Sequence, residues 1–269
     1  MRVAVAQFSA GMNKSANLER VTELTGRAAD AGARVVVFPE GAMCDFGAPT
    51  DDLHDFAEPL DGRFVHTLAT LAGRSGLTIV AGMFESIPGQ RLIYNSAVVV
   101  DPANGLSGTY RKRHLFDAFG EIESERFRPG GDDPLMVPID DFKVAVVVCY
   151  DIRFASFIER AADAGAEMLL APAAWVAGPL KEEHLSVLAH ARALDNTIYV
   201  AVGGQIGPNY TGRSVIVDPL GATLAGLGDA EGIAIADVTR ERLQAARKRL
   251  PVIAQRQAAR AAAAGRSVS

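Results

Sequence analysis

Cysteine is scarce in this sequence: Cys44 and Cys149 are the only two among 269 residues. Two cysteines cannot build the several disulfides on which small secreted domains depend. We therefore expect a reducing, cytoplasmic setting in which both side chains are free thiols. The question that follows is whether either thiol is reactive.

Long apolar runs are also missing. No segment approaches the roughly 18 apolar residues of a membrane-spanning helix, and the opening MRVAVAQFSAG has too short an apolar run for a signal peptide. The net charge of −5 argues against nucleic acid as the main partner, because it implies no dominant basic face. We therefore expect neither a membrane nor nucleic acid as a partner.

Motifs for nucleotides and metals are absent from the sequence as well. It contains neither GxGxxG nor a P-loop, and neither CxxC nor HExxH. His184 and His190 are too far apart along a helix to share one ligand face. We therefore expect no metal and no cofactor, so that side chains must perform whatever chemistry the protein has.

Apolar, β-branched runs alternate with helical periodicity along most of the chain. Several runs are apolar throughout, which indicates strands that are covered on both faces. Nine strands are many for one open sheet, so we expect an α/β layered fold with two sheets. The expected strands are 2–8, 34–38, 77–84, 96–101, 143–149, 167–171, 198–204, 214–218 and 232–238, and the expected helices are 15–32, 62–75, 154–165, 181–196 and 239–250.

One internal similarity favours two related halves. ADAGARVVVFPE (29–40) and ADAGAEMLLAPA (162–173) share a helix end, Gly-Ala, a strand and a proline at matching positions. Approximate twofold symmetry would produce this match, although Ala-Gly-Ala before a strand is also a common helix stop. We expect one domain over residues 1–250, followed by an Ala- and Arg-rich extension or loose helix over 251–269.

Cys149 is the first candidate for chemistry. It ends the apolar run of FKVAVVVCYDIRF (142–154), where α/β proteins place groups that contact ligands. A helix is expected to begin near Phe154, and its N-terminal field would favour a thiolate nearby. The competing interpretation is a buried core cysteine, the common state of this residue type. Cys44 has no comparable setting and is interpreted as structural.

A cysteine nucleophile needs a proton acceptor. None of the five histidines ends an apolar strand, and each fits a surface or packing position better. Glu40 follows the apolar run of VVVFPE, where a carboxylate could act as a base or could lie in an exposed loop. Lys112 lies within TYRKRHLFD (109–117), a charge cluster that is usually solvated but could turn one lysine inward to stabilise an oxyanion.

Taken together, these motifs resemble the nitrilase superfamily of carbon-nitrogen hydrolases. FPE, YRKRHLFD, IESERFRPG, CYDIRF, PAAWVAGPLKEEH and GRSVIVDPLGATLA occur in family order over roughly residues 1–250. YRKRHLFDAFGEIES and PAAWVAGPLKEEH are most similar to the ω-amidases and deaminated-glutathione amidases. The resemblance implies a four-layer αββα sandwich with two mixed sheets, a homodimer or higher homo-oligomer, and no cofactor.

The resemblance also implies a mechanism. Cys149 would attack a small linear amide and form a thioester, with release of ammonia. Glu40 would be the general base, while Lys112 and the backbone N–H of Tyr150 would hold the oxyanion. Glu123 would position the substrate and the lysine.

Further residues are expected around this site. Arg153 and Trp175 would contact the substrate, and Asp151 with Arg153 would brace the turn after Cys149. A substrate carboxylate would pair with a cation near the mouth of the pocket. The candidates for that cation are Arg111, Arg113 and Arg126.

Two alternative functions remain open from the sequence. An N-carbamoyl amino acid amidohydrolase or a nitrilase would use the same Glu-Lys-Cys triad on a different substrate. A non-catalytic binding protein could keep the same fold, although the presence of Glu40, Lys112, Glu123 and Cys149 argues against this.

Overall fold

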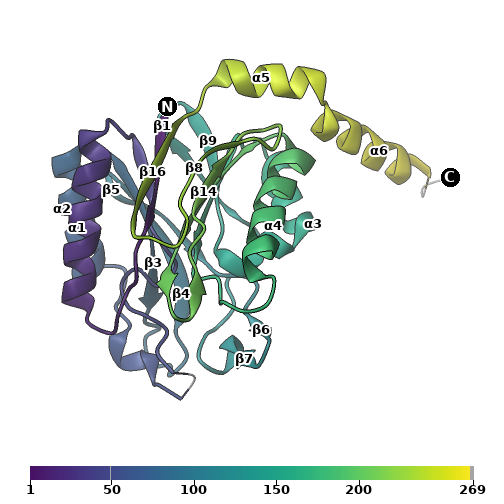
Figure 1. The fold of residues 1–269 in the computed structure, drawn as a ribbon. Helices are drawn as coiled ribbons and strands as arrows, with labels where there is room; N and C mark the ends of the chain where they lie inside the picture. The colour runs from purple at the N-terminus through teal and green to yellow at the C-terminus, as the bar shows by residue number, and fades with distance from the viewer. Residues whose placement is uncertain (49, 267–269) are drawn as a thin grey trace.

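The computed structural model describes residues 1–48 and 50–266 of the chain. Figure 1 shows four layers, with two sheets face to face between two pairs of helices. The helix pairs are α1 (Lys14–Asp30) with α2 (Arg63–Ser75), and α3 (Ala155–Asp163) with α4 (Lys181–Asn196). The expected α/β fold, an αββα sandwich with two mixed sheets, is therefore confirmed.

The first sheet has the strand order β16-β1-β2-β3-β4-β5. Its three central strands, β1, β2 and β3, run parallel, and the others pair antiparallel with their neighbours. These strands are β1 (Arg2–Gln7), β2 (Val35–Val37), β3 (Thr78–Glu85), β4 (Tyr94–Asp101), β5 (Gly105–Arg111) and β16 (Gly232–Asp237).

The second sheet has the order β15-β14-β11-β10-β9-β8, again with three parallel strands, β9, β10 and β11, inside antiparallel neighbours. In both sheets a helix follows the first and the second parallel strand. The parallel cores of the two sheets therefore share one topology, as the internal similarity predicts. The strands are β8 (Leu135–Ile139), β9 (Phe142–Val146), β10 (Met168–Ala173), β11 (Tyr199–Gly204), β14 (Val215–Val217) and β15 (Thr223–Gly226).

Alternate residues of β1 enter two different hydrophobic clusters. Val3 and Val5 pack toward the second sheet, whereas Ala4 and Ala6 join residues of α1 and α2. Successive side chains of a strand point to opposite faces, so a strand covered on both faces needs apolar residues at every position. This explains the unbroken apolar runs of the sequence.

Shorter elements complete the chain, and several of them lie beyond the strand ends. They are η1 (Leu53–Phe56), β6 (Asp117–Ala118), β7 (Glu121–Ile122), η2 (Glu123–Glu125), η3 (Cys149–Arg153), β12 (Ile206–Gly207) and β13 (Tyr210–Thr211). The prediction of a strand over 143–149 is wrong at its end. β9 stops at Val146, and Cys149 begins the 3-10 turn η3 instead.

The C-terminal region is helical as far as Arg266. After α5 (Arg240–Arg249), helix α6 (Val252–Arg266) extends away from the sandwich (Figure 1). Arg256 contacts Asp163 of α3 at 2.8 Å, and Arg260 contacts Glu159 at 2.6 Å. Within the described residues, no helix is both long and apolar enough to cross a membrane.

The two sheets approach each other closely at a glycine. A Cβ on Gly203 of β11 would lie 2.4 Å from the carbonyl oxygen of Val37 of β2. Real Cβ atoms do not come this close to backbone, so a larger residue would push the sheets apart.

We predict that Gly203→Ala lowers the free energy of unfolding by about 1–3 kcal/mol, as overpacked cores do. Urea denaturation measures the change. Gly26→Ala is the matched control, because Gly26 lies in α1 and a Cβ at that position would meet nothing within 4 Å, and alanine should raise helix stability by about 0.5–1 kcal/mol. Equal effects of the two substitutions would contradict the close approach of the sheets.

Candidate active site

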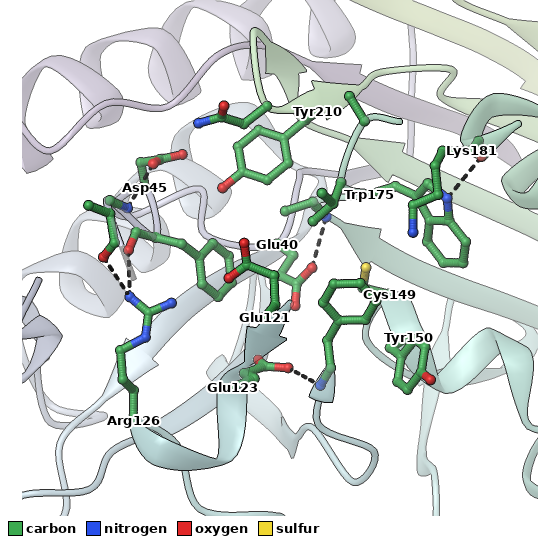
Figure 2. Close-up of a pocket in the computed structure, with 18 of the residues that line it drawn as sticks. Glu40, Asp45, Glu121, Glu123, Arg126, Cys149, Tyr150, Trp175, Lys181 and Tyr210 are labelled. Atoms are coloured by element: carbon green, nitrogen blue, oxygen red, sulfur yellow. Dashed lines mark hydrogen bonds between the residues drawn. The ribbon is translucent and has the colours of Figure 1, made fainter. Parts of the chain in front are cut away.

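A pocket of about 560 Å³ opens at the carboxyl ends of strands from both sheets. Glu40 follows β2, Lys112 follows β5, Cys149 follows β9 and Trp175 follows β10, and all four line the pocket. Figure 2 shows Glu40, Cys149 and Trp175 around it. Carboxyl ends of parallel strands meet at one edge of a sheet, which is where α/β folds bind ligands. The structure thus brings the predicted residues together.

The backbone of Glu40 lies directly against β3. A Cβ on Gly82 would come within 2.6 Å of the Glu40 Cα, so only glycine leaves room for this approach. On the other side, the side chain of Gln205 donates to the Glu40 carbonyl at 2.9 Å. Contacts from both sheets therefore fix the position of Glu40.

Lys112 lies between two buried carboxylates. Its Nζ donates to Glu40 Oε1 at 2.9 Å and to Glu123 Oε2 at 2.8 Å, and no side chain of the three is more than 5% exposed. Burial alone would lower the pKa of Lys112, but Glu123 and Glu40 outweigh it and raise that pKa well above its usual value. The ammonium therefore stays charged.

Asn95 closes this group into a ring. Its Nδ2 donates to Glu40 Oε1 at 2.8 Å and to Glu123 Oε1 at 2.7 Å, from a side chain that is 1% exposed. Asn95 is not among the site residues predicted from the sequence, where it comes just before the expected strand 96–101. The available signal was an amide at the start of an otherwise buried run, YNSAVVVD, but that alone does not indicate which groups it faces.

Backbone N–H groups add a further hydrogen bond to each carboxylate. The Ala174 N–H donates to Glu40 Oε2 at 2.8 Å, and the Phe116 N–H donates to Glu123 Oε2 at 2.6 Å. A buried carboxylate is costly unless such donors surround it. Both glutamates are thus held in fixed orientations within the pocket.

Cys149 has a strained backbone and a neutral thiol. Its φ of +46° lies in the left-handed region that non-glycine residues rarely adopt, and such strain is concentrated at functional sites. Burial, reinforced by the nearby Glu40, raises the pKa of the thiol well above its usual value. The expected thiolate is therefore wrong for the resting protein, because burial and Glu40 outweigh the field of α3, which begins only at Ala155.

Asp151 braces the turn that carries Cys149. Its Oδ2 accepts from the Val148 N–H at 3.0 Å and from the Tyr110 hydroxyl at 2.7 Å, while Oδ1 accepts from the His114 N–H at 2.9 Å. Tyr110 and His114 flank Lys112 in the sequence, so Asp151 connects the segment that carries the lysine to the turn that carries the thiol. These hydrogen bonds support the prediction that Asp151 braces the turn after Cys149.

Arg153 lies elsewhere than expected. Its guanidinium stacks 4.8 Å from the Trp175 ring centroid and 5.8 Å from that of Tyr150, and it forms no ion pair with Asp151 among the residues that the structure describes. Trp175 lines the pocket, but Arg153 is not among the described lining residues. The structure therefore supports Trp175, and not Arg153, as a wall of the site.

Of the three arginines predicted to bind a substrate carboxylate, only Arg126 is among the described residues that line the pocket. Arg111 pairs with Glu85 at 2.8 Å and Arg113 with Asp132 at 2.8 Å, and neither is among the described pocket-lining residues. Arg126 does line the pocket, and so does Lys181, which is not among the candidates predicted from the sequence. Among the described residues, no group of three or more His, Cys, Asp or Glu is arranged to hold a metal ion.

The backbone strain at Cys149 leads to a stability prediction. Cys149→Gly should unfold with a free energy about 1 kcal/mol higher than Cys149→Ala, because glycine tolerates the left-handed conformation. Chemical denaturation of the two variants measures the difference. Cys44→Gly should be less stable than Cys44→Ala, because the φ of Cys44 is not positive. If the glycine variant were the less stable one at Cys149 as well, the result would argue against strain at Cys149.

Comparison with known proteins identifies the family of the chain. The sequence model of the carbon-nitrogen hydrolase family matches residues 2–248. The chain is 35% identical to the deaminated glutathione amidase of Escherichia coli O157:H7, over 95% of this chain and 97% of that one. It is 33% identical to the omega-amidase NIT2 of Danio rerio, over 95% and 94% of the two chains.

A solved structure shows the same fold. It is a mutant of the amidase from Nesterenkonia sp. AN1, in which acrylamide has undergone Michael addition at the active site cysteine. The TM-score is 0.79 and the identity is 26%, over 91% of this chain and 95% of that one. On the match of the family model and of these relatives over almost the whole chain, this protein belongs to the carbon-nitrogen hydrolase family, as the motifs of the nitrilase superfamily predict.

Proposed function

We propose that this carbon-nitrogen hydrolase cleaves a small linear amide through a thioester on Cys149 and releases ammonia. The observation that carries the proposal is the buried ring of Glu40, Lys112, Glu123 and Asn95 beside a neutral thiol. It offers a proton acceptor, a fixed cation and a nucleophile in one pocket, which are the parts that acyl transfer requires.

The first half of the reaction makes the thioester. Glu40 takes the proton from Cys149 as the sulfur attacks the amide carbon, and the carbonyl oxygen becomes an oxyanion. Lys112 and the backbone N–H of Tyr150 donate to that oxyanion. Glu40 then gives its proton to the nitrogen, the C–N bond breaks, and ammonia leaves.

The second half regenerates the enzyme. Glu40 removes a proton from a water molecule as its oxygen attacks the thioester carbon. The C–S bond breaks, the carboxylic acid leaves, and the sulfur of Cys149 recovers its proton from Glu40. Glu123 accepts hydrogen bonds from Lys112 and Asn95 at 2.8 and 2.7 Å, and in this scheme it keeps the lysine directed at the reacting oxygen.

The substrate class follows from the relatives and the pocket. Two relatives are named deaminated glutathione amidase and omega-amidase, and the site of this chain holds the cations Arg126 and Lys181. Both observations favour an amide that also bears a carboxylate over a nitrile or an N-carbamoyl amino acid. The homodimer and the cytoplasmic setting expected from the sequence stay predictions.

A substrate panel tests the proposed reaction. Ammonia release should occur with at least one carboxylate-bearing primary amide, such as α-ketoglutaramate or succinamate. It should fall to background in Cys149→Ala, with Cys44→Ala as the control that keeps activity. Turnover confined to a nitrile or an N-carbamoyl amino acid would overturn the substrate class, and undiminished turnover in Cys149→Ala would overturn the mechanism.

The hydrogen-bond ring gives a second prediction. Asn95→Leu, similar in branched shape but without donors, should lower kcat about 100-fold with little change in KM, because misplaced reacting groups cost rates of that order. Steady-state kinetics on the best amide of the panel, with melting temperatures to verify folding, measures the effect. Asn104→Leu is the control, since Asn104 lies in an exposed turn beside Asp101; a normal kcat in Asn95→Leu would exclude a positioning role.

A further inference from the structure

One side of the pocket holds a buried cation without an anion. Lys181, the first residue of α4, lines the pocket, yet only 3% of the residue is exposed. Its ammonium faces the rings of Phe116, Phe119 and Trp175, at 5.0, 4.0 and 5.6 Å from their centroids. This ammonium makes no hydrogen bond and no ion pair with any residue that the structure describes.

A second cation that forms no ion pair with any described residue lies on the same indole ring. Arg153 stacks on Trp175 and its Nη2 lies 3.4 Å from His184 Nδ1, but its buried Nε has no hydrogen-bond partner among the described residues. Burial and the neighbouring charge of Arg153 together lower the pKa of Lys181. Two like charges on one ring repel each other, and no acidic side chain among the described residues pairs with either, so an anion that entered this place would be favoured.

The other side of the pocket is different. Arg126 Nη1 already donates to the carbonyl oxygens of Phe46 and Ala48, at 2.8 and 3.3 Å. Figure 2 shows Asp45 on the same side, whereas Lys181 and Trp175 lie on the opposite side, with Cys149 between. The negative charge of Asp45 disfavours an anion near Arg126, and no carboxylate among the described residues pairs with Lys181.

We propose that Lys181 binds the carboxylate of the substrate and thereby selects linear amides whose acyl chain ends in a carboxylate. This inference rests on the proposed amide hydrolysis and adds the residue that recognises the substrate. Three aromatic faces hold the ammonium without giving it a hydrogen-bond acceptor, so its donors stay available for the carboxylate. Arg153, behind the ring of Trp175, adds positive potential to the same subsite.

Lys181 has one competing role. Phe116 and Phe119 belong to the segment around the β6–β7 hairpin, so the cation–π contacts could serve only to anchor that hairpin. An anchor would affect every substrate alike. A carboxylate-binding residue would affect only the substrates that carry the charge.

The test compares two amides of equal length, succinamate and levulinamide, which differ in a terminal carboxylate against a neutral acetyl group. In Lys181→Met, the ratio of kcat/KM for succinamate to that for levulinamide should fall about 10- to 100-fold, the loss expected for a charge-assisted hydrogen bond. Most of the change should be in KM. Lys181→Arg, which keeps the charge, should restore most of the preference.

Matched variants make the outcome specific. Lys248→Met on α5 removes an exposed lysine and should leave the ratio unchanged. Lys181→Gln keeps a side chain of similar length with a donor, and it decides the question if Lys181→Met does not fold. An unchanged ratio in the folded variant, or an equal loss on both amides, would overturn carboxylate recognition and leave Lys181 as an anchor of the hairpin.

The outcome is separable from that of the proposed function. Ammonia release that disappears in Cys149→Ala keeps the amidase mechanism standing whatever happens to the ratio. If no amide of the panel gives release that depends on Cys149, the proposed function fails, and carboxylate recognition fails with it.

Discussion

The site depends on one buried ammonium held between two carboxylates. Lys112 contacts Glu40 and Glu123 at 2.9 and 2.8 Å in a place almost closed to water. With the thiol of Cys149 neutral, the three charges sum to −1. A thiolate formed by loss of the proton to solvent would make the total charge −2 in a medium of low dielectric, where like charges repel each other strongly. Transfer of the thiol proton to Glu40 avoids this, because the total stays at −1.

The same constraint connects the charge network to the architecture. Uncompensated buried charges are costly, so the carboxylates need donors in addition to Lys112. Those donors come from both sheets: Asn95 from β4 of the first, and the Ala174 N–H directly after β10 of the second. The face-to-face packing of two similar halves thus supplies the network. A displacement of one sheet against the other would break it.

Much of the fold follows from local sequence patterns. Unbroken apolar runs such as RVVVF (34–38) identify strands that are covered on both faces, and the match between 29–40 and 162–173 corresponds to equivalent helix–strand units, α1–β2 and α3–β10, in the two sheets. The positions of Glu40, Lys112 and Cys149 at or just beyond strand ends are also readable, since the carboxyl ends of strands gather at one edge.

What the sequence could not reveal depends on contacts between distant segments. Asn95 and Gln205 reach Glu40 across separations of 55 and 165 residues. The burial of Lys181 comes from the rings of Phe116, Phe119 and Trp175, so in KEEH it resembles an ordinary helix start. The state of the Cys149 thiol was misjudged because the helix field is visible locally, whereas burial is a property of the folded chain.

The most direct test of the account is the mass of Cys149 during turnover. Acid quenching of the enzyme with a reactive amide, followed by proteolysis and mass spectrometry, should find the acyl group on the peptide that contains Cys149, in a form that hydroxylamine removes. Glu40→Gln should form this adduct far more slowly, since it lacks the proton acceptor. Hydrolysis at full rate without any adduct on Cys149, or adduct formation unaffected by Glu40→Gln, would contradict the account.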